Sequence, residues 1–200
     1  MSEPNGVTAL KSRLSVMMFL QFFIWGVWYV PMYPFLDGLG VDATKIGFAY
    51  GATGLAAIVS PIFIGMVADK FFPSQIVLAV LHLVGGLFLF MASRATDWAS
   101  FIPYILAHLF CYMPTLALAN SVLFQSVRDP QKEAPAIRTL GTIGWIVAGV
   151  VVGSSFLVGA EETLKFQMPG FLGGPKAPDD SIGLGLTNVP LLIGAGASVL

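Results

Sequence analysis

Long apolar stretches separated by short polar ones dominate the hydrophobic pattern of this 200-residue chain. A bilayer core about 30 Å thick is crossed by roughly 17 to 25 apolar residues in a helix that rises about 1.5 Å per residue. The stretches that meet this requirement are 14–36, 46–68, 75–92, 100–124 and 137–158. We expect each to be a membrane-spanning helix, because hydrocarbon forces a segment to satisfy its backbone hydrogen bonds internally.

The two ends of the pattern differ from the middle. Residues 1–13 are polar and precede an apolar stretch too long for a cleaved signal peptide, so we expect a retained first helix behind a cytoplasmic N-terminus. Residues 186–200 open a sixth apolar stretch that is too short to cross a bilayer. We interpret it as the start of a sixth helix in a truncated chain. Residues 159–185 are rich in glycine and proline, which predicts a long extracytoplasmic loop.

The distribution of lysine and arginine predicts the orientation. Cytoplasmic loops carry an excess of these residues when the loops are short. Lys45 and Arg94 fall on the side opposite the N-terminus, whereas the N-terminal side carries Lys11, Arg13, Lys70, Arg128 and Lys132. The N-terminus is therefore expected in the cytoplasm.

Composition excludes several classes of protein. With 56% hydrophobic residues, 10% charged residues and a mean hydropathy of +0.81, the chain lacks the charged surface of a soluble domain. Its net charge of -1 gives no basic footprint for nucleic acid. Cys111 is the only cysteine, so no internal disulfide forms, and no metal site is expected because no Cys/His spacing resembles zinc ligation. No nucleophile with its base and no phosphate-binding loop is recognisable, so we expect a protein that is not an enzyme.

Prolines and glycines fall in two of the predicted helices at corresponding positions of a three-plus-three repeat. Stretch 14–36 contains Gly26, Pro31 and Pro34, and stretch 100–124 contains Pro103 and Pro114. Paired interrupted helices of this kind indicate the binding site of a transporter. The alternative is that proline is simply common in membrane helices.

Polar and aromatic residues at helical spacing supply candidate binding groups. Arg138, Thr142 and Trp145 lie on one face of their helix, where a guanidinium fork, a hydroxyl and a ring suit a sugar joined to a base. Arg138 could instead anchor the helix at the cytoplasmic surface. Gln21 and Trp25 lie on one face of the first helix, where either could contact a solute or pack against a neighbouring helix.

Groups that could carry a proton are scarce. His108 lies in an apolar run and could titrate near neutral pH, but a hydrogen bond to a neighbouring helix is the simpler interpretation. No aspartate or glutamate lies within a complete predicted span. A proton-coupled carrier commonly uses such a carboxylate, so we expect the coupling group outside this chain.

Four motifs together resemble a known family. Gly65, Asp69 and Lys70 match the first half of the major facilitator loop signature, although Phe71, Phe72 and Pro73 replace its second half. The other motifs are the runs LQFFIWGVW (20–28), YMPTL (112–116) and PAIRTLGTIGW (135–145). In order and spacing, the four are similar to the nucleoside:proton symporter family of bacterial permeases. The resemblance covers residues 14–158 and fails in 159–185.

This resemblance implies an all-α integral membrane fold, the N-terminal six-helix bundle of the major facilitator type with a 3+3 inverted repeat. It implies import of nucleosides by proton symport with alternating access, in a bacterial inner membrane, against a C-terminal six-helix bundle and with no cofactor besides the proton. Arg138, Thr142 and Trp145 would bind the nucleoside together with Gln21 and Trp25, although the family has phenylalanine at the position of Trp145. Gly65, Asp69 and Lys70 would serve conformational change.

Two other functions fit the same residues. A facilitator of the same fold could carry another polar solute such as a sugar, because rings and hydroxyl donors also bind pyranoses. A membrane receptor or structural subunit could bind a ligand without moving it.

Overall fold

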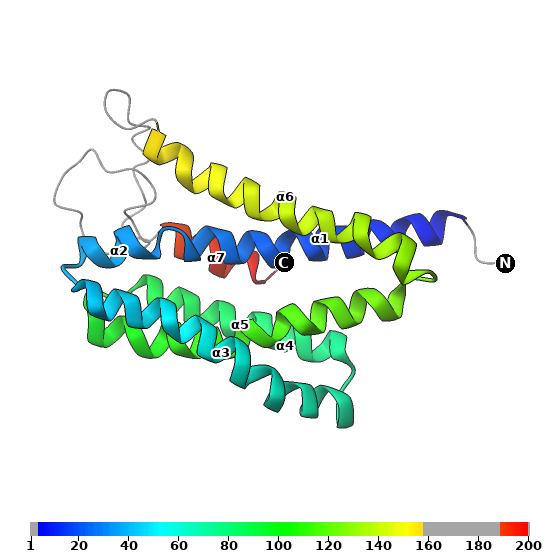
Figure 1. Cartoon of the computed structure of the whole chain (residues 1–200), viewed down its shortest axis with the longest axis horizontal. Coiled ribbons are helices and arrows are strands. Elements are labelled where there is room, and N and C mark those ends of the chain that lie inside the picture. Colours follow the sequence, from blue (N-terminus) through cyan, green and yellow to red (C-terminus); the bar gives the residue numbers. More distant parts are fainter. Residues whose placement is uncertain (1–3, 158–188, 200) are drawn as a thin grey trace.

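The structure is a computed structural model that describes residues 4–157 and 189–199, and all regular elements in this part of the chain are helices. The elements are α1 (Pro4–Tyr29), α2 (Met32–Gly38), α3 (Ala43–Lys70), α4 (Ser74–Ser93), α5 (Trp98–Ser126), α6 (Pro130–Leu157) and α7 (Val189–Ala197). The long helices run roughly along one axis and reverse direction at each connection (Figure 1). Five segments are long and apolar enough to cross a membrane, with α1 and α2 counted as one.

Each of the five predicted stretches corresponds to helix in the described residues, the first being divided between α1 and α2, and the helices extend beyond the stretches. The largest difference is at α1, which begins at Pro4 instead of Leu14, and α6 likewise begins at Pro130 instead of Ile137. Hydropathy marks only the part of a helix that hydrocarbon covers, so polar first turns such as Pro130 to Glu133 are missed. The predicted loop 159–185 lies outside the described residues, and α7 occupies 189–197 of the predicted sixth stretch.

The predicted interruption is present in the first helix and absent from the fourth. The first helix stops at Tyr29 and resumes at Met32, because Pro31 and Pro34 remove two N–H donors within one turn. In contrast, α5 continues from Trp98 to Ser126 through both of its prolines, so the expectation of an interruption there is wrong. Prolines are tolerated in membrane helices where neighbouring helices hold the segment, and α5 packs along both α3 and α4.

The helices pack mainly in pairs. The most extensive contacts join α1 to α6 and α4 to α5, and α7 lies against both α1 and α4 (Figure 1). Contact between α1 and α5 is much smaller. A core of buried apolar residues fills the space between these helices, including Trp28, Phe101 and Leu89. Lys11 and Glu133 form an ion pair at 2.9 Å that joins α1 to the first turn of α6.

Glycines allow α1 and α6 to approach closely. A Cβ atom on Gly26 would lie 2.8 Å from the Cβ of Ala148, and one on Gly141 would lie 2.6 Å from the ring of Phe22. At Gly144 the added carbon would overlap the backbone carbonyl of Phe19. The hydrophobic effect does not drive helices together in lipid, so they associate through van der Waals packing. Small residues at a crossing allow that packing to be close.

Replacement of Gly144 by alanine is predicted to destabilise the protein by about 1 to 3 kcal/mol, the usual range for overpacking, because a backbone atom cannot rotate away. The matched control is Gly149→Ala on the same helix, where a Cβ would meet no atom within 4 Å. Thermal melting of the purified full-length protein in detergent measures the stability of both variants. Equal melting temperatures for the two variants would show that α1 and α6 do not cross at Gly144.

Candidate solute-binding face of the helix bundle

Helix α6 presents three kinds of surface. The face toward α1 is buried and consists of small and apolar residues at helical spacing: Ala134, Ile137, Gly141, Gly144, Ala148 and Val152. Beside it lies a polar face with exposed Arg138 and Thr142 and half-buried Trp145, which we call the α6 polar face. A third surface is apolar and exposed, with Ile143, Ile146 and Val150.

These surfaces differ in the environment that they suit. Exposed isoleucine and valine are the side chains that contact lipid at no cost. An arginine in contact with lipid inside a span costs about 2.5 to 3.5 kcal/mol on insertion scales. Arg138 makes no ion pair with any described residue. The α6 polar face is therefore the surface of this helix that suits a solute or an aqueous cavity.

Arg138 lies deeper along its helix than the apolar stretch suggested. The sequence placed Arg138 about one turn from the end of the helix, but α6 begins at Pro130, eight residues before Arg138. Eight residues correspond to about 12 Å along the axis. The added turn is polar and lies outside the apolar stretch, so the greater length of α6 does not by itself place Arg138 deeper in hydrocarbon.

An aromatic row connects the α6 polar face to the neighbouring helices. The rings of Trp145 and Trp25 meet edge to face at 5.2 Å between centroids, Trp25 meets Tyr29 at 5.9 Å, and Tyr29 meets Tyr50 at 4.9 Å. All four rings are half-buried. The indole Nε1 of Trp25 has no hydrogen-bond acceptor among the described residues. The row thus offers ring surface beside Arg138 and Thr142, whereas the Trp25 Nε1 is itself buried.

Gln21, in contrast, is enclosed in a hydrogen-bond network on the other side of α1. Its amide Nε2 donates to the hydroxyl of Thr115 on α5 at 2.8 Å, and its Oε1 lies 2.9 Å from Nε2 of His82 on α4. The hydroxyl of Tyr112, also on α5, donates to the backbone carbonyl of Gln21. Gln21 is 2% exposed, so the structure favours the role of joining helices over that of binding a solute.

The donors in this network can be assigned in sequence. The Thr115 hydroxyl donates to the carbonyl of Tyr112, so it must accept from the Gln21 amide. The Gln21 oxygen then faces His82, which must donate through Nε2–H. Sequence reasoning missed His82, although its signal was present as a histidine within an apolar span.

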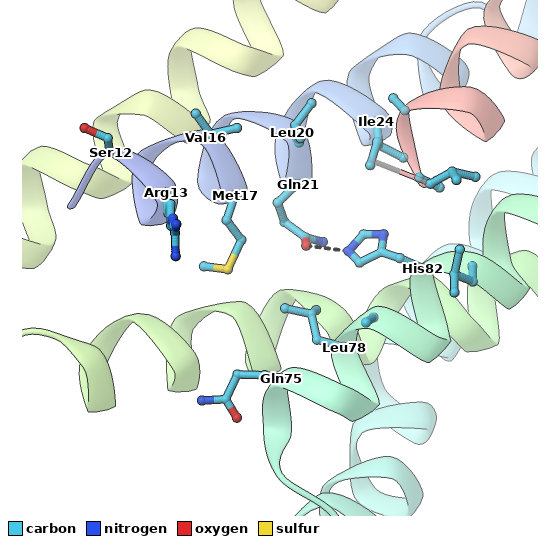
Figure 2. A pocket seen from close by; sticks show the side chains of 15 residues that line it. Ser12, Arg13, Val16, Met17, Leu20, Gln21, Ile24, Gln75, Leu78 and His82 are labelled. Carbon is cyan, nitrogen blue, oxygen red and sulfur yellow. Dashed lines mark hydrogen bonds between the residues drawn. The ribbon is translucent and has the colours of Figure 1, made fainter. Parts of the chain in front are cut away.

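A cavity of about 530 Å³ lies between α1, α4 and α7. Figure 2 shows Gln21 and His82 meeting at its wall, with Arg13, Met17 and Gln75 towards one end. None of Trp25, Arg138, Thr142 and Trp145 lines it. The two predicted binding residues of α1 therefore lie on different sides of that helix. Trp25 lies beside the α6 polar face, whereas Gln21 faces α4 and α5.

The remaining sequence candidates have simpler environments. His108 is fully buried, and its Nδ1 bonds the carbonyl of Gly85 on α4 at 2.9 Å, which confirms the hydrogen bond expected to a neighbouring helix. Gly65, Asp69 and Lys70 belong to the end of α3 and not to a loop, and Lys70 is exposed in its last turn. A Cβ on Gly65 would meet no atom within 4 Å, so Gly65 makes no close helix contact with the described residues.

Comparison with known proteins decides the family. The sequence model described as "Nucleoside H+ symporter" matches residues 8–171. The chain belongs to the nucleoside H+ symporter family. It is accordingly a multi-pass, all-helical membrane protein of the major facilitator type.

Relatives within the family include transporters from Escherichia coli K12. The chain is 42% identical over 189 residues to the protein named "Putative nucleoside transporter YegT", and this match covers 94% of the chain and 40% of YegT. It is 38% identical over 152 residues to the nucleoside permease NupG, and here the match covers 73% of the chain and 36% of NupG. The crystal structure of NupG superposes with a TM-score of 0.76 at 32% identity, over 94% of this chain and 41% of that one. The chain therefore spans less than half of these relatives.

The role of Gln21 in joining helices predicts the effect of its removal. Gln21→Leu leaves Thr115 and His82 without their partner and should lower the melting temperature of the full-length protein in the absence of any nucleoside. Interhelical hydrogen bonds in membranes are worth about 0.6 kcal/mol on average and up to about 1.7. Because this change removes two of them, we expect a loss of roughly 1 to 3 kcal/mol.

Gln75→Leu is the matched control, because Gln75 is exposed and makes no hydrogen bond to a described residue. Thermal melting and calorimetric titration with uridine should be measured on both variants. A Gln21→Leu protein that melts like wild type but binds uridine more weakly would assign Gln21 to the solute site instead.

Proposed function

We propose that this chain is the N-terminal part of a nucleoside transporter that couples uptake of its substrate to the entry of protons. The observation that carries the proposal is the α6 polar face, where Arg138 and Thr142 are exposed beside Trp145 and Trp25. Membership of the nucleoside H+ symporter family gives the substrate class and the coupling ion to be tested.

The chemistry of these side chains matches the two halves of a nucleoside. A guanidinium donates up to five hydrogen bonds and can hold two oxygens at once, which suits ribose hydroxyls or a base carbonyl. The Thr142 hydroxyl adds a donor and an acceptor one turn away. The Trp145 and Trp25 rings supply flat apolar surface for the base.

The distribution of basic residues supports an orientation with the N-terminus in the cytoplasm. Lys11, Lys70 and Arg128 lie at one end of the bundle, where α1 begins, α3 ends and α5 is followed by α6, whereas Lys45 and Arg94 lie at the other (Figure 1). Arg138 is then in the cytoplasmic half of α6. In a bacterial cell the corresponding membrane is the inner membrane.

Transport in this proposal is completed by a second helix bundle that faces the α6 polar face. Carriers of this type move solute by rocking one bundle against the other around a site near the midplane. Gly65, Asp69 and Lys70, at the cytoplasmic end of α3, are proposed to take part in this movement. A proton drives uptake only as far as it binds the two states of the carrier with different affinity.

We predict that cells expressing the full-length protein take up radiolabelled uridine and that a protonophore abolishes this uptake. Arg138→Lys keeps the positive charge but loses the planar fork. If Arg138 holds two nucleoside oxygens, this variant should raise the uridine KM roughly tenfold or more, because a hydrogen bond to a charged group is worth about 1.5 to 3 kcal/mol. If Arg138 only anchors the helix, lysine serves equally well and KM stays at the wild-type value.

Thr142→Ala and Thr139→Ala form a matched pair one turn apart. Thr142 belongs to the α6 polar face, whereas the Thr139 hydroxyl bonds the carbonyl of Pro135 within its own helix. Only Thr142→Ala should weaken uptake at equal expression. Excess unlabelled glucose tests the alternative that the protein carries a sugar. If glucose displaces uridine, or if wild type takes up no uridine, the nucleoside assignment is wrong.

A further inference from the structure

The break in the first helix is bridged by a side chain from another helix. In an unbroken helix the carbonyl of Tyr29 would accept from the N–H of Tyr33, four residues further on. Instead the hydroxyl of Tyr50, on α3, lies between them. It accepts from the Tyr33 N–H at 3.0 Å and donates to the Tyr29 carbonyl at 2.9 Å.

This arrangement satisfies two backbone groups that the break in the helix separates from each other. Sharp changes of direction in helices occur at proline or where a side chain enters the backbone ladder, and both causes coincide here. An unpaired backbone group inside a membrane costs several kcal/mol. The Tyr50 hydroxyl donates its only proton to the backbone and also accepts a hydrogen bond from the backbone. It therefore serves the helix break rather than a solute.

The same residue is one end of the aromatic row. The Tyr50 ring packs edge to face on Tyr29, which packs on Trp25, which meets Trp145 of the α6 polar face. The hydroxyl therefore fixes the backbone of Tyr29 while the ring fixes its side chain. Both constraints act on the residue that is one turn from Trp25.

We propose that Tyr50 is a positioning residue of the nucleoside site. Through its hydroxyl it joins α2 to α1 across the proline break, and through Tyr29 it holds Trp25 against Trp145. This inference rests on the proposed function for its substrate, but the bridge across the break can be tested without any nucleoside.

Tyr50→Phe removes the hydroxyl and keeps the ring, and Tyr33→Phe is the control, because the Tyr33 side chain is 51% exposed and its hydroxyl bonds no described residue. Hydrogen–deuterium exchange of the full-length protein in detergent should show the Tyr33 amide exchanging at least about tenfold faster in Tyr50→Phe, since that amide loses its acceptor. Uridine uptake by the same variant should show KM raised about two- to tenfold, the equivalent of one net hydrogen bond, with the maximal rate per transporter unchanged.

Each outcome decides one part of the proposal. Exchange at the wild-type rate in Tyr50→Phe would show that the hydroxyl does not hold the break, and the proposal would fall. Faster exchange with an unchanged uridine KM would leave Tyr50 a structural role only and would overturn its role in positioning the site. If wild type takes up no uridine, the proposed function fails, whereas the exchange experiment still decides whether Tyr50 bridges α1 and α2.

Discussion

Hydrocarbon contains no water, so every polar group carried into the bilayer must find a partner in the protein or face a cavity that solute and water reach. The backbone meets this constraint by forming helices, and where prolines interrupt the first helix the Tyr50 hydroxyl supplies the missing partner. Gln21 and His108 meet it through bonds to neighbouring helices. Arg138 and Thr142 are exposed on the α6 polar face. Their exposure is what distinguishes that face as the proposed solute-binding face.

Helix α1 connects this face to the rest of the bundle. Glycines at the crossing with α6 bring the two backbones close, which places Trp25 against Trp145. On its other side α1 approaches α5 less closely than it approaches α6, and the bonds of Gln21 to Thr115 and His82 join it to α5 and α4. One helix thus carries a packed side, a polar junction and part of the proposed solute-binding face.

Sequence reasoning found the spans, the family and the α6 polar face, because hydropathy and helical spacing are local properties of the chain. It could not assign Gln21, since a glutamine that joins helices and one that binds solute have the same local pattern. It missed Tyr50 and His82, whose partners lie on other helices and become neighbours only in the folded bundle. It also expected an interruption in α5, where the helix is continuous through Pro114 and packs against α3 and α4.

The central claim is that the α6 polar face lines the solute pathway whereas the adjacent apolar surface faces lipid. The most direct test places single cysteines in full-length protein whose native cysteines, Cys111 included, are replaced, and measures their reaction with a charged, membrane-impermeant thiol reagent. Thr142→Cys should react, and uridine should slow the reaction, while Ile146→Cys, one turn away on the apolar surface, should stay unmodified. A Thr142→Cys protein that does not react, or that reacts at the same rate with and without uridine, would contradict the account.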